Sequence, residues 1–180
     1  TERSHSLRVP YYFNIAPDRD LILALTYMTS RGLIYESKYR QLIKPKITKD
    51  GEHSLWEMET RYLYDDKITN LNRWLVDTSI KLDISEKTHL SAQYYRVSDA
   101  QYFTDIARTN TDVSTLHSHL KLSFKDPGKH LDATVLTEDF KVVNDGSPVY
   151  SKALEGSISK TFNADKKMPI TFDTISTKFA

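Results

Sequence analysis

Residues 116–125 read Leu-His-Ser-His-Leu-Lys-Leu-Ser-Phe-Lys, and this alternation of apolar and polar residues decides the fold class. Successive side chains of a pleated strand point to opposite faces, so Leu116, Leu120, Leu122 and Phe124 share one face. The two histidines and both lysines occupy the other face. The stretch therefore predicts a β-strand with one dry face and one wet face.

The same period of two recurs along the chain. Apolar residues occupy alternate positions from Trp74 to Ile84, and no long window has the three-and-four spacing of an amphipathic helix. Turn-forming residues such as Asp-Gly and Asp-Pro-Gly divide the chain into roughly nine strands. The strand candidates, of which the first is a short piece, cover residues 6–14, 20–29, 33–43, 54–64, 73–84, 88–97, 116–125, 130–143, 150–162 and 170–179. We therefore expect an all-β antiparallel meander with almost no helix.

The length of the strands favours a membrane location. Several candidates have ~9–12 residues, whereas strands of soluble proteins usually have ~5–6. A tilted strand that crosses a bilayer needs ~9–11 residues. Length, strict alternation and eleven tyrosines together favour an outer-membrane β-barrel. A soluble β-sandwich that binds a ligand alternates in the same way and is the alternative.

Aromatic residues near the strand ends fit a barrel. Tyrosine and tryptophan bury a ring and keep a polar group wet, which suits the interface between a membrane and water. The candidates for such an aromatic girdle are Tyr11, Tyr12, Phe13, Trp56, Tyr62, Tyr64, Trp74, Tyr94 and Tyr95. In a soluble sandwich the same residues would form the core.

Composition excludes several other classes of protein. The 180 residues suffice for one ordinary domain. Lys plus Arg is 25 and Asp plus Glu is 24, so no basic excess points to nucleic acid. Cysteine is absent, which removes disulfide scaffolds and thiol chemistry. Residues 1–5 are polar and have no secretory signal, and no apolar run is long enough for a transmembrane helix.

Candidate chemistry is weak. His117 and His119 share a strand face and could approach one zinc ion, but no third ligand is predictably near. Glu57 and Glu59 share a face like the carboxylate pair of a hydrolase. The wet face of a barrel accounts for all four residues. We therefore expect no enzyme activity, no catalytic residue, no cofactor and no metal site.

Five blocks of the first 105 residues carry a resemblance. They are Val-Pro-Tyr-Tyr-Phe-Asn-Ile-Ala-Pro-Asp-Arg-Asp at 9–20, Tyr-Met-Thr-Ser-Arg-Gly-Leu at 27–33, Glu-Ser-Lys-Tyr-Arg-Gln-Leu at 36–42, Arg-Trp-Leu at 73–75 and Tyr-Arg-Val-Ser-Asp-Ala-Gln-Tyr-Phe-Thr-Asp at 95–105. In this order they resemble segments of the LPS-assembly outer-membrane protein family (LptD, also called organic solvent tolerance protein). Beyond residue 105 only the strand pattern matches.

The resemblance implies a fold, a function and a location. Residues 1–180 would be one β region, the N-terminal part of a large barrel in the outer membrane of a Gram-negative bacterium. Such a barrel inserts lipopolysaccharide (LPS) into the outer leaflet. The implied partners are LPS, a plug lipoprotein inside the barrel, and a periplasmic bridge protein. The bridge protein would act through a jelly-roll domain that these 180 residues lack, as they lack the later strands.

We single out two groups of candidate site residues, one at a barrel seam and one that faces the barrel lumen. Proline has no N–H for a β-ladder, so Pro10 suggests a weakened seam between the first and last barrel strands, against the simpler reading of a strand start. The seam candidates are Pro10, Tyr11, Tyr12, Asn14 and Pro17. The candidates that face the barrel lumen are His117, His119 and Lys121.

Overall fold

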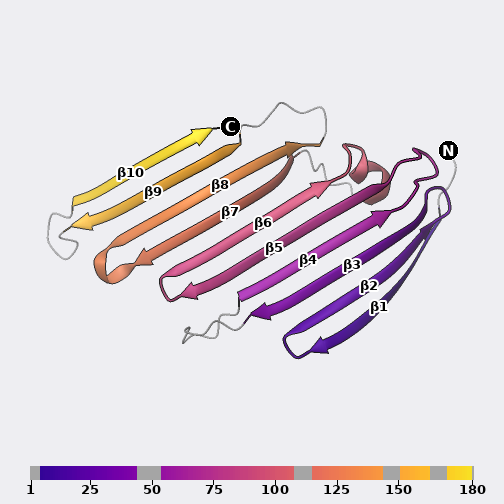
Figure 1. Ribbon diagram of the computed structural model, residues 1–180, viewed down its shortest axis with the longest axis horizontal. Helices are drawn as coiled ribbons and strands as arrows, with labels where there is room; N and C mark the ends of the chain where they lie inside the picture. Colours follow the sequence, from indigo (N-terminus) through magenta and orange to yellow (C-terminus); the bar gives the residue numbers. More distant parts are fainter. Residues whose placement is uncertain (1–4, 44–53, 108–114, 144–150, 163–169, 180) are drawn as a thin grey trace.

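The computed structural model is a single antiparallel sheet of ten strands in which each strand pairs with its neighbours in sequence (Figure 1). It describes residues 5–43, 54–107, 115–143, 151–162 and 170–179. The strands are β1 (Ser6–Ala16), β2 (Arg19–Met28), β3 (Gly32–Ile43), β4 (Ser54–Leu63), β5 (Arg73–Ser85), β6 (Thr88–Val97), β7 (Thr115–Asp126), β8 (Leu131–Val142), β9 (Lys152–Phe162) and β10 (Ile170–Phe179). The all-β antiparallel meander predicted from the sequence is confirmed.

The strand count differs slightly from the prediction of roughly nine. The short piece at 6–14 is a full strand of 11 residues, because β1 pairs along its length with β2. Helical structure in the described residues consists of the π-helical turn η1 (Phe103–Ala107) and the 3₁₀ turn η2 (Pro127–Lys129). No helix in these residues is long and apolar enough to span a membrane.

The register of the strands extends the alternation across the sheet. Leu82 pairs with Leu90, Leu90 with Leu122, and Leu122 with Val135, so these residues share one face. We call this the apolar face. Its members include Val9, Tyr11, Leu23, Leu25, Tyr35, Tyr62, Trp74, Ile80, Leu82, Leu90, Leu120, Leu122, Val135, Ile158 and Phe172. Six of the nine girdle candidates lie on this side, Tyr12 and Tyr95 point to the other, and Tyr64 lies in the connection after β4.

The opposite, polar face carries most of the charge. Its members include Arg8, Asp20, Glu36, Lys38, Arg40, Glu57, Glu59, Arg61, Asp77, Gln93, His117, His119, Lys121 and Glu138. On the apolar face the described strands carry charge only within four residues of a strand end. A strand buried on both faces would show no such contrast.

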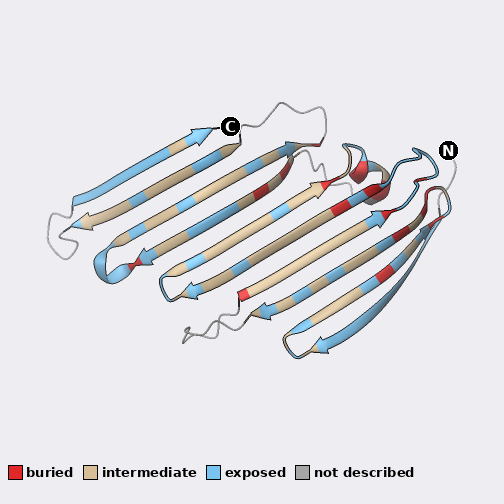
Figure 2. Cartoon of the chain, viewed as in Figure 1, coloured by how far each residue is buried: buried red, intermediate tan, exposed pale blue. Residues whose placement is uncertain are grey.

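Neither face is covered by a second layer over most of the sheet. Figure 2 shows most of the buried residues gathered at one end of the central strands; of the others, Ala24 lies within β2, and Ser54 and Asp126 lie at the opposite end. Leu120 is 48% exposed and Tyr11 is 64% exposed. The buried hydrophobic cluster consists of Met28, Ile34, Leu63, Leu75, Val97, Tyr102, Phe103, Ile106, Leu116 and Val143. We call this end of the sheet the capped end and the other the open end.

Two turns show why the strands reverse where they do. At the capped end Gly32 has a φ of 118°, which L side chains rarely adopt, so β3 begins at a glycine. At the open end the Asp126 side chain accepts a hydrogen bond from the Lys129 N–H, and His130 takes the left-handed conformation. These features close the hairpins β2–β3 and β7–β8.

The bare apolar face and the two free edges, β1 and β10, predict the behaviour of the isolated 180-residue chain. Unpaired strand edges and exposed apolar surface promote association in water. We expect the chain to self-associate in plain buffer and to become monodisperse in detergent, as measured by analytical ultracentrifugation. A monodisperse monomer in plain buffer, with Leu120 and Leu122 still exposed, would contradict the facing assignment.

Candidate functional site

The free edge of β1 lacks a hydrogen-bond donor at Pro10. The Thr29 N–H donates to the His5 carbonyl at 3.0 Å, so residue 5 directs its backbone groups toward β2. Backbone polar groups of an antiparallel strand alternate in direction, and the register with β2 is unbroken as far as Asn14. Even-numbered residues of β1 therefore direct their backbone groups to the free edge. Pro10 removes a donor from this edge and none from the ladder with β2.

The structure places all five seam candidates on this edge strand or in the turn that follows it. Tyr11 lies on the apolar face with its ring centroid 4.5 Å from that of Phe13. Tyr12 lies on the polar face, where its hydroxyl donates to Asp20 at 3.5 Å. Asn14 is exposed near the end of β1, and Pro17 lies in the exposed turn before β2. The strand that would close a seam is not among the ten, so the seam role stays a prediction.

The three lumen candidates share the polar face of β7. His117 Nε2 lies 3.0 Å from Glu138 Oε1, and its ring stacks on Phe140 at 4.6 Å. His119 Nε2 lies 2.8 Å from Ser91 Oγ, while Lys121 is exposed. All three point away from Leu120 and Leu122 on the same strand. Whether this face lines a lumen stays a prediction.

Charged residues on the polar face are mostly paired across or along strands. Arg8 meets Glu36 at 3.0 Å and Arg40 meets Asp20 at 2.6 Å. Of the carboxylates considered for hydrolysis, Glu59 pairs with Arg61 at 2.8 Å, and Glu57 lies on the same face. No group of three or more His, Asp or Glu side chains is placed to hold a metal ion within the described ranges.

A buried ion network closes the capped end. Arg73, the first residue of β5, is 2% exposed at its side chain and donates to three carboxylates: Asp66 at 3.3 Å, Asp99 at 2.5 Å and Asp105 at 2.8 Å. Arg31, from the β2–β3 turn, also binds Asp66, at 2.6 Å, and Asp105, at 3.1 Å. Two arginines thus share two aspartates and join three connections between strands.

Aromatic side chains cover this network. Tyr102 and Phe103 are 1% and 7% exposed, and their rings meet edge to face at 5.7 Å. The Arg73 guanidinium lies 5.9 Å from the Tyr102 ring centroid, and Phe103 also contacts Tyr95 of β6 at 6.2 Å. Asp99 starts the turn by accepting the Gln101 N–H at 3.1 Å. The segment after β6 therefore folds back over the end of the sheet.

Hydrogen bonds from neighbouring groups favour the ionised form of Asp66 and of Asp99 in the network. Burial alone would raise the pKa of Asp66, but the Ile68 N–H, Arg31 and Arg73 all donate to it, and they hold its pKa below the ordinary value of 3.8. Burial likewise opposes ionisation of Asp99, and donation from Arg73 lowers its pKa below 3.8. Because both folded-state pKa values are lowered, this contribution to stability is complete above the unfolded pKa. It is lost as pH falls through the lowered values.

Sequence reasoning gave these residues no role, although most of them lie in the blocks quoted for the resemblance. Arg31, Arg73, Asp99 and Asp105 belong to the blocks at 27–33, 73–75 and 95–105, whereas Asp66 lies outside them. In the sequence, these network residues appear only as single charged residues inside motifs that are otherwise apolar or turn-forming. The structure unites three of the five blocks in one cluster.

Comparison with known proteins supplies a family. No protein-family model matches the chain. Among curated proteins, the LPS-assembly protein LptD of Salmonella typhimurium is 30% identical over 154 residues, 81% of this chain and 19% of that protein. The protein of the same name from Cupriavidus pinatubonensis is 36% identical over 101 residues, 56% of this chain and 12% of that protein. The one from Shewanella frigidimarina is 27% identical over 184 residues, 99% of this chain and 22% of that protein. The chain thus spans about a fifth or less of these relatives.

The buried network predicts that Arg73 contributes more to stability than Arg61. Removing one partner of a buried ion pair costs about 3–5 kcal/mol, whereas an exposed pair contributes about 0–1 kcal/mol. We expect Arg73→Met to lower the unfolding temperature of the complete protein in detergent, as read from its heat-dependent mobility on gels. Arg61→Met, which breaks the more exposed pair with Glu59, is the matched control. Equal stability of the two variants would show that the network does not hold the capped end.

Proposed function

Because the chain belongs to the LPS-assembly protein LptD family, we propose that it forms the N-terminal part of an outer-membrane barrel that inserts LPS into the outer leaflet. The observation that carries the proposal is the single sheet with one apolar and one polar face along all ten strands. A bilayer covers the apolar face, and the polar face lines the passage. A soluble β-sandwich would need a second sheet over the apolar face, and all ten strands lie in one.

Strand lengths and charge placement support the barrel. The strands have 10 to 13 residues, as a tilted strand needs to cross a bilayer. Charges on the lipid side of a barrel cost ~2–4 kcal/mol at the midplane and little at the interface. The apolar face follows this rule, since its charged residues stand near strand ends. Tyr62 and Trp74 lie at the same capped end, where aromatic residues favour the interface.

The remaining parts of the proposal concern the complete protein. The barrel acts as a transport pore and carries no enzyme chemistry, cofactor or metal of its own. A plug lipoprotein fills part of the lumen next to the polar face. A periplasmic jelly-roll domain, encoded outside these 180 residues, receives LPS from the bridge protein.

The β1 edge forms one side of the exit. Last and first strands of a closed barrel pair through their backbone groups, and the missing donor at Pro10 weakens that pairing at one position. LPS leaves sideways through this seam into the outer leaflet. Tyr11 and Tyr12 flank the gap on the apolar and the polar face respectively.

Restoring the donor tests the seam. Pro10→Ala in the complete protein adds one N–H to the free edge, and one hydrogen bond contributes about 0.5–1.5 kcal/mol, or roughly 2- to 10-fold in pairing. We expect more disulfide crosslinking between engineered cysteines in β1 and the closing strand, and slower arrival of LPS at the cell surface. Pro127→Ala, which adds one N–H in the β7–β8 turn outside the seam, is the control. Unchanged crosslinking and unchanged surface LPS in Pro10→Ala would reject the seam.

The facing of β7 gives a second test. Leu122→Arg places a charge on the apolar face, which we expect to impair assembly of the complete protein in the outer membrane. His119→Arg places the same side chain on the polar face and should be tolerated. Assembly is measured by the amount of heat-modifiable protein in outer-membrane fractions. Equal assembly of the two variants would contradict the assignment of lipid and lumen faces.

A further inference from the structure

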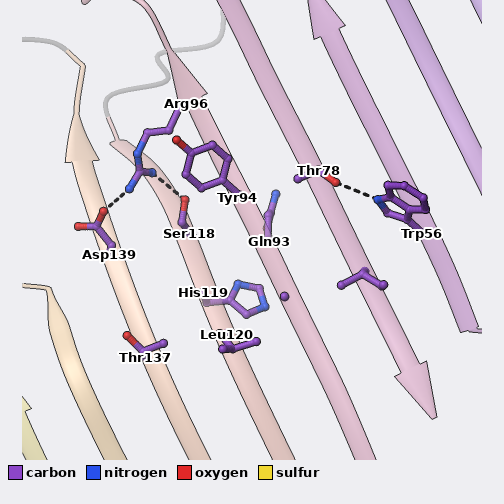
Figure 3. Close-up of a pocket in the computed structure, with 12 residues that line it drawn as sticks. Trp56, Thr78, Gln93, Tyr94, Arg96, Ser118, His119, Leu120, Thr137 and Asp139 are labelled. Carbon is purple, nitrogen blue, oxygen red and sulfur yellow. Dashed lines mark hydrogen bonds and ion pairs between the residues drawn. The ribbon is translucent and has the colours of Figure 1, made fainter. Parts of the chain in front are cut away.

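The sheet forks between β6 and β7 at the capped end. Their ladder stops at the pair Gln93–His119. Beyond it β6 stays paired with β5 as far as Val97, and β7 stays paired with β8 as far as Thr115. Figure 3 shows Arg96 and Ser118 standing in the space where the two strands separate. The strands part here although neither of them ends.

Side chains replace the missing ladder. Ser118 Oγ accepts from the Tyr95 N–H at 3.0 Å and from Arg96 Nη1 at 2.7 Å. Arg96 Nη2 also donates to Asp139 on β8. Lys141 Nζ, two residues further along β8, donates to the Val97 carbonyl at 3.4 Å. The fork thus gathers two cations and one carboxylate on the apolar side of the sheet.

A hollow of about 410 Å³ is lined by two of these charges, Arg96 and Asp139. Its apolar lining includes Trp56, Ile80, Ala92 and Leu120. Figure 3 labels Trp56 and Leu120 on opposite sides of it. Ala92 has the smallest side chain of the four, so the space next to it stays open between its larger neighbours. The Trp56 indole N–H donates to the Thr78 hydroxyl at 3.1 Å, which in turn donates to the Glu57 carbonyl. These polar groups satisfy one another, so this part of the hollow presents methyl groups and rings.

Charge and position together indicate the occupant. Arg96, Lys141 and Asp139 sum to one net positive charge, and Lys141 forms no ion pair with any described residue. Arg96 and Lys141 are the next-to-last residues of β6 and β8, so both lie at the capped end of the sheet. The Arg96 guanidinium lies over the Tyr94 ring, with its central carbon 5.3 Å from the ring centroid. Tyr94 thus adds an aromatic ring of the kind found at membrane interfaces.

We propose that this hollow binds one phospholipid of the surrounding bilayer, with an acyl chain against Ala92 and Leu120 and the phosphate at Arg96 and Lys141. The proposal rests on the proposed function, which places the apolar face in lipid. One net positive charge complements one phosphodiester. The exposed Asp139 carboxylate disfavours the clustered phosphates of LPS, so we assign the site to a phospholipid. Bound there, the lipid closes the fork on its outer side.

The test uses the complete protein in detergent with added dioleoylphosphatidylglycerol, and native mass spectrometry counts the retained lipid. We expect Ala92→Leu, which fills the hollow, and Lys141→Ala, which removes the unpaired cation, each to weaken retention about fivefold or more. Two matched controls lie on the same face away from the hollow. Ala133→Leu adds the same bulk, and Lys160→Ala removes a cation near the open end; both should retain lipid as the unaltered protein does.

The outcomes separate this proposal from the one on which it rests. Unchanged retention in Ala92→Leu and Lys141→Ala overturns the lipid site, as does preferential retention of LPS in a parallel arm with purified LPS. Lys141 is exposed and its removal costs one long hydrogen bond to the Val97 carbonyl, so Lys141→Ala decides the matter where Ala92→Leu fails to fold. Surface LPS in cells is the separate readout of the proposed function. A protein that transports LPS but retains lipid equally in all variants rejects the phospholipid site alone.

Discussion

The buried Arg73 guanidinium is the interaction on which the capped end depends. A buried cation is tolerated only when anions and hydrogen-bond acceptors surround it, and Arg73 finds three aspartates. Those aspartates come from the β4–β5 connection and the segment after β6, and Arg31 adds the β2–β3 turn. Satisfying one charge therefore draws three separate connections together. The apolar cluster around Tyr102 and Leu63 forms where those connections meet.

A sheet without a second layer would otherwise have little to define its shape. Strand pairing fixes neighbours but contributes no core, and the described strands leave both faces largely open. Within the part of the chain that the structure describes, packing, ion pairs and turns reinforce each other at the capped end. That end involves strands β2 to β6 and the segment after β6, with Leu116 and Val143 as the contribution of the following hairpin. The described strands β1, β9 and β10 add no residue to that cluster, so they depend on backbone pairing and on cross-strand side-chain contacts such as Thr177 with Glu155.

Period-two patterning predicted the strands well because the interaction behind it is local. The alternation of 73–84 or 116–125 is visible in the printed residues, and the observed strands β5 and β7 match these ranges to within a residue. The network escaped prediction because its partners are distant in sequence: Arg31 and Asp66 are 35 residues apart, and Arg73 and Asp105 are 32 apart. The fork was equally hidden. Nothing in the alternation of β6 and β7 signals that Ser118 takes over the bonds of a backbone partner.

Backbone pairing is incomplete at two places in the sheet, the β1 edge and the fork between β6 and β7, and the physical cause differs between them. At the β1 edge a covalent feature, the proline ring, removes a donor, and no side chain replaces it. At the fork, backbone bonds give way to Ser118, Arg96 and Asp139, whose geometry can adjust. A missing donor weakens pairing at one position, which is the property that the proposed exit seam requires. Replaceable side-chain bonds let the sheet bend without losing partners, which suits an internal junction.

The polar face adds the last element of the transport proposal. Its ion pairs, such as Arg8 with Glu36 and Arg40 with Asp20, are exposed and nearly neutral in sum, so each contributes little to stability. A passage must admit its cargo and also release it, which requires binding that is spread over many weak contacts. A lining with uncompensated cations would hold the phosphates of LPS, whereas paired charges keep the wall wet and offer no strong site. Among the described residues, the ion pairs in which both side chains are most deeply buried, those of Arg73 and Arg31 with Asp66, lie at the capped end.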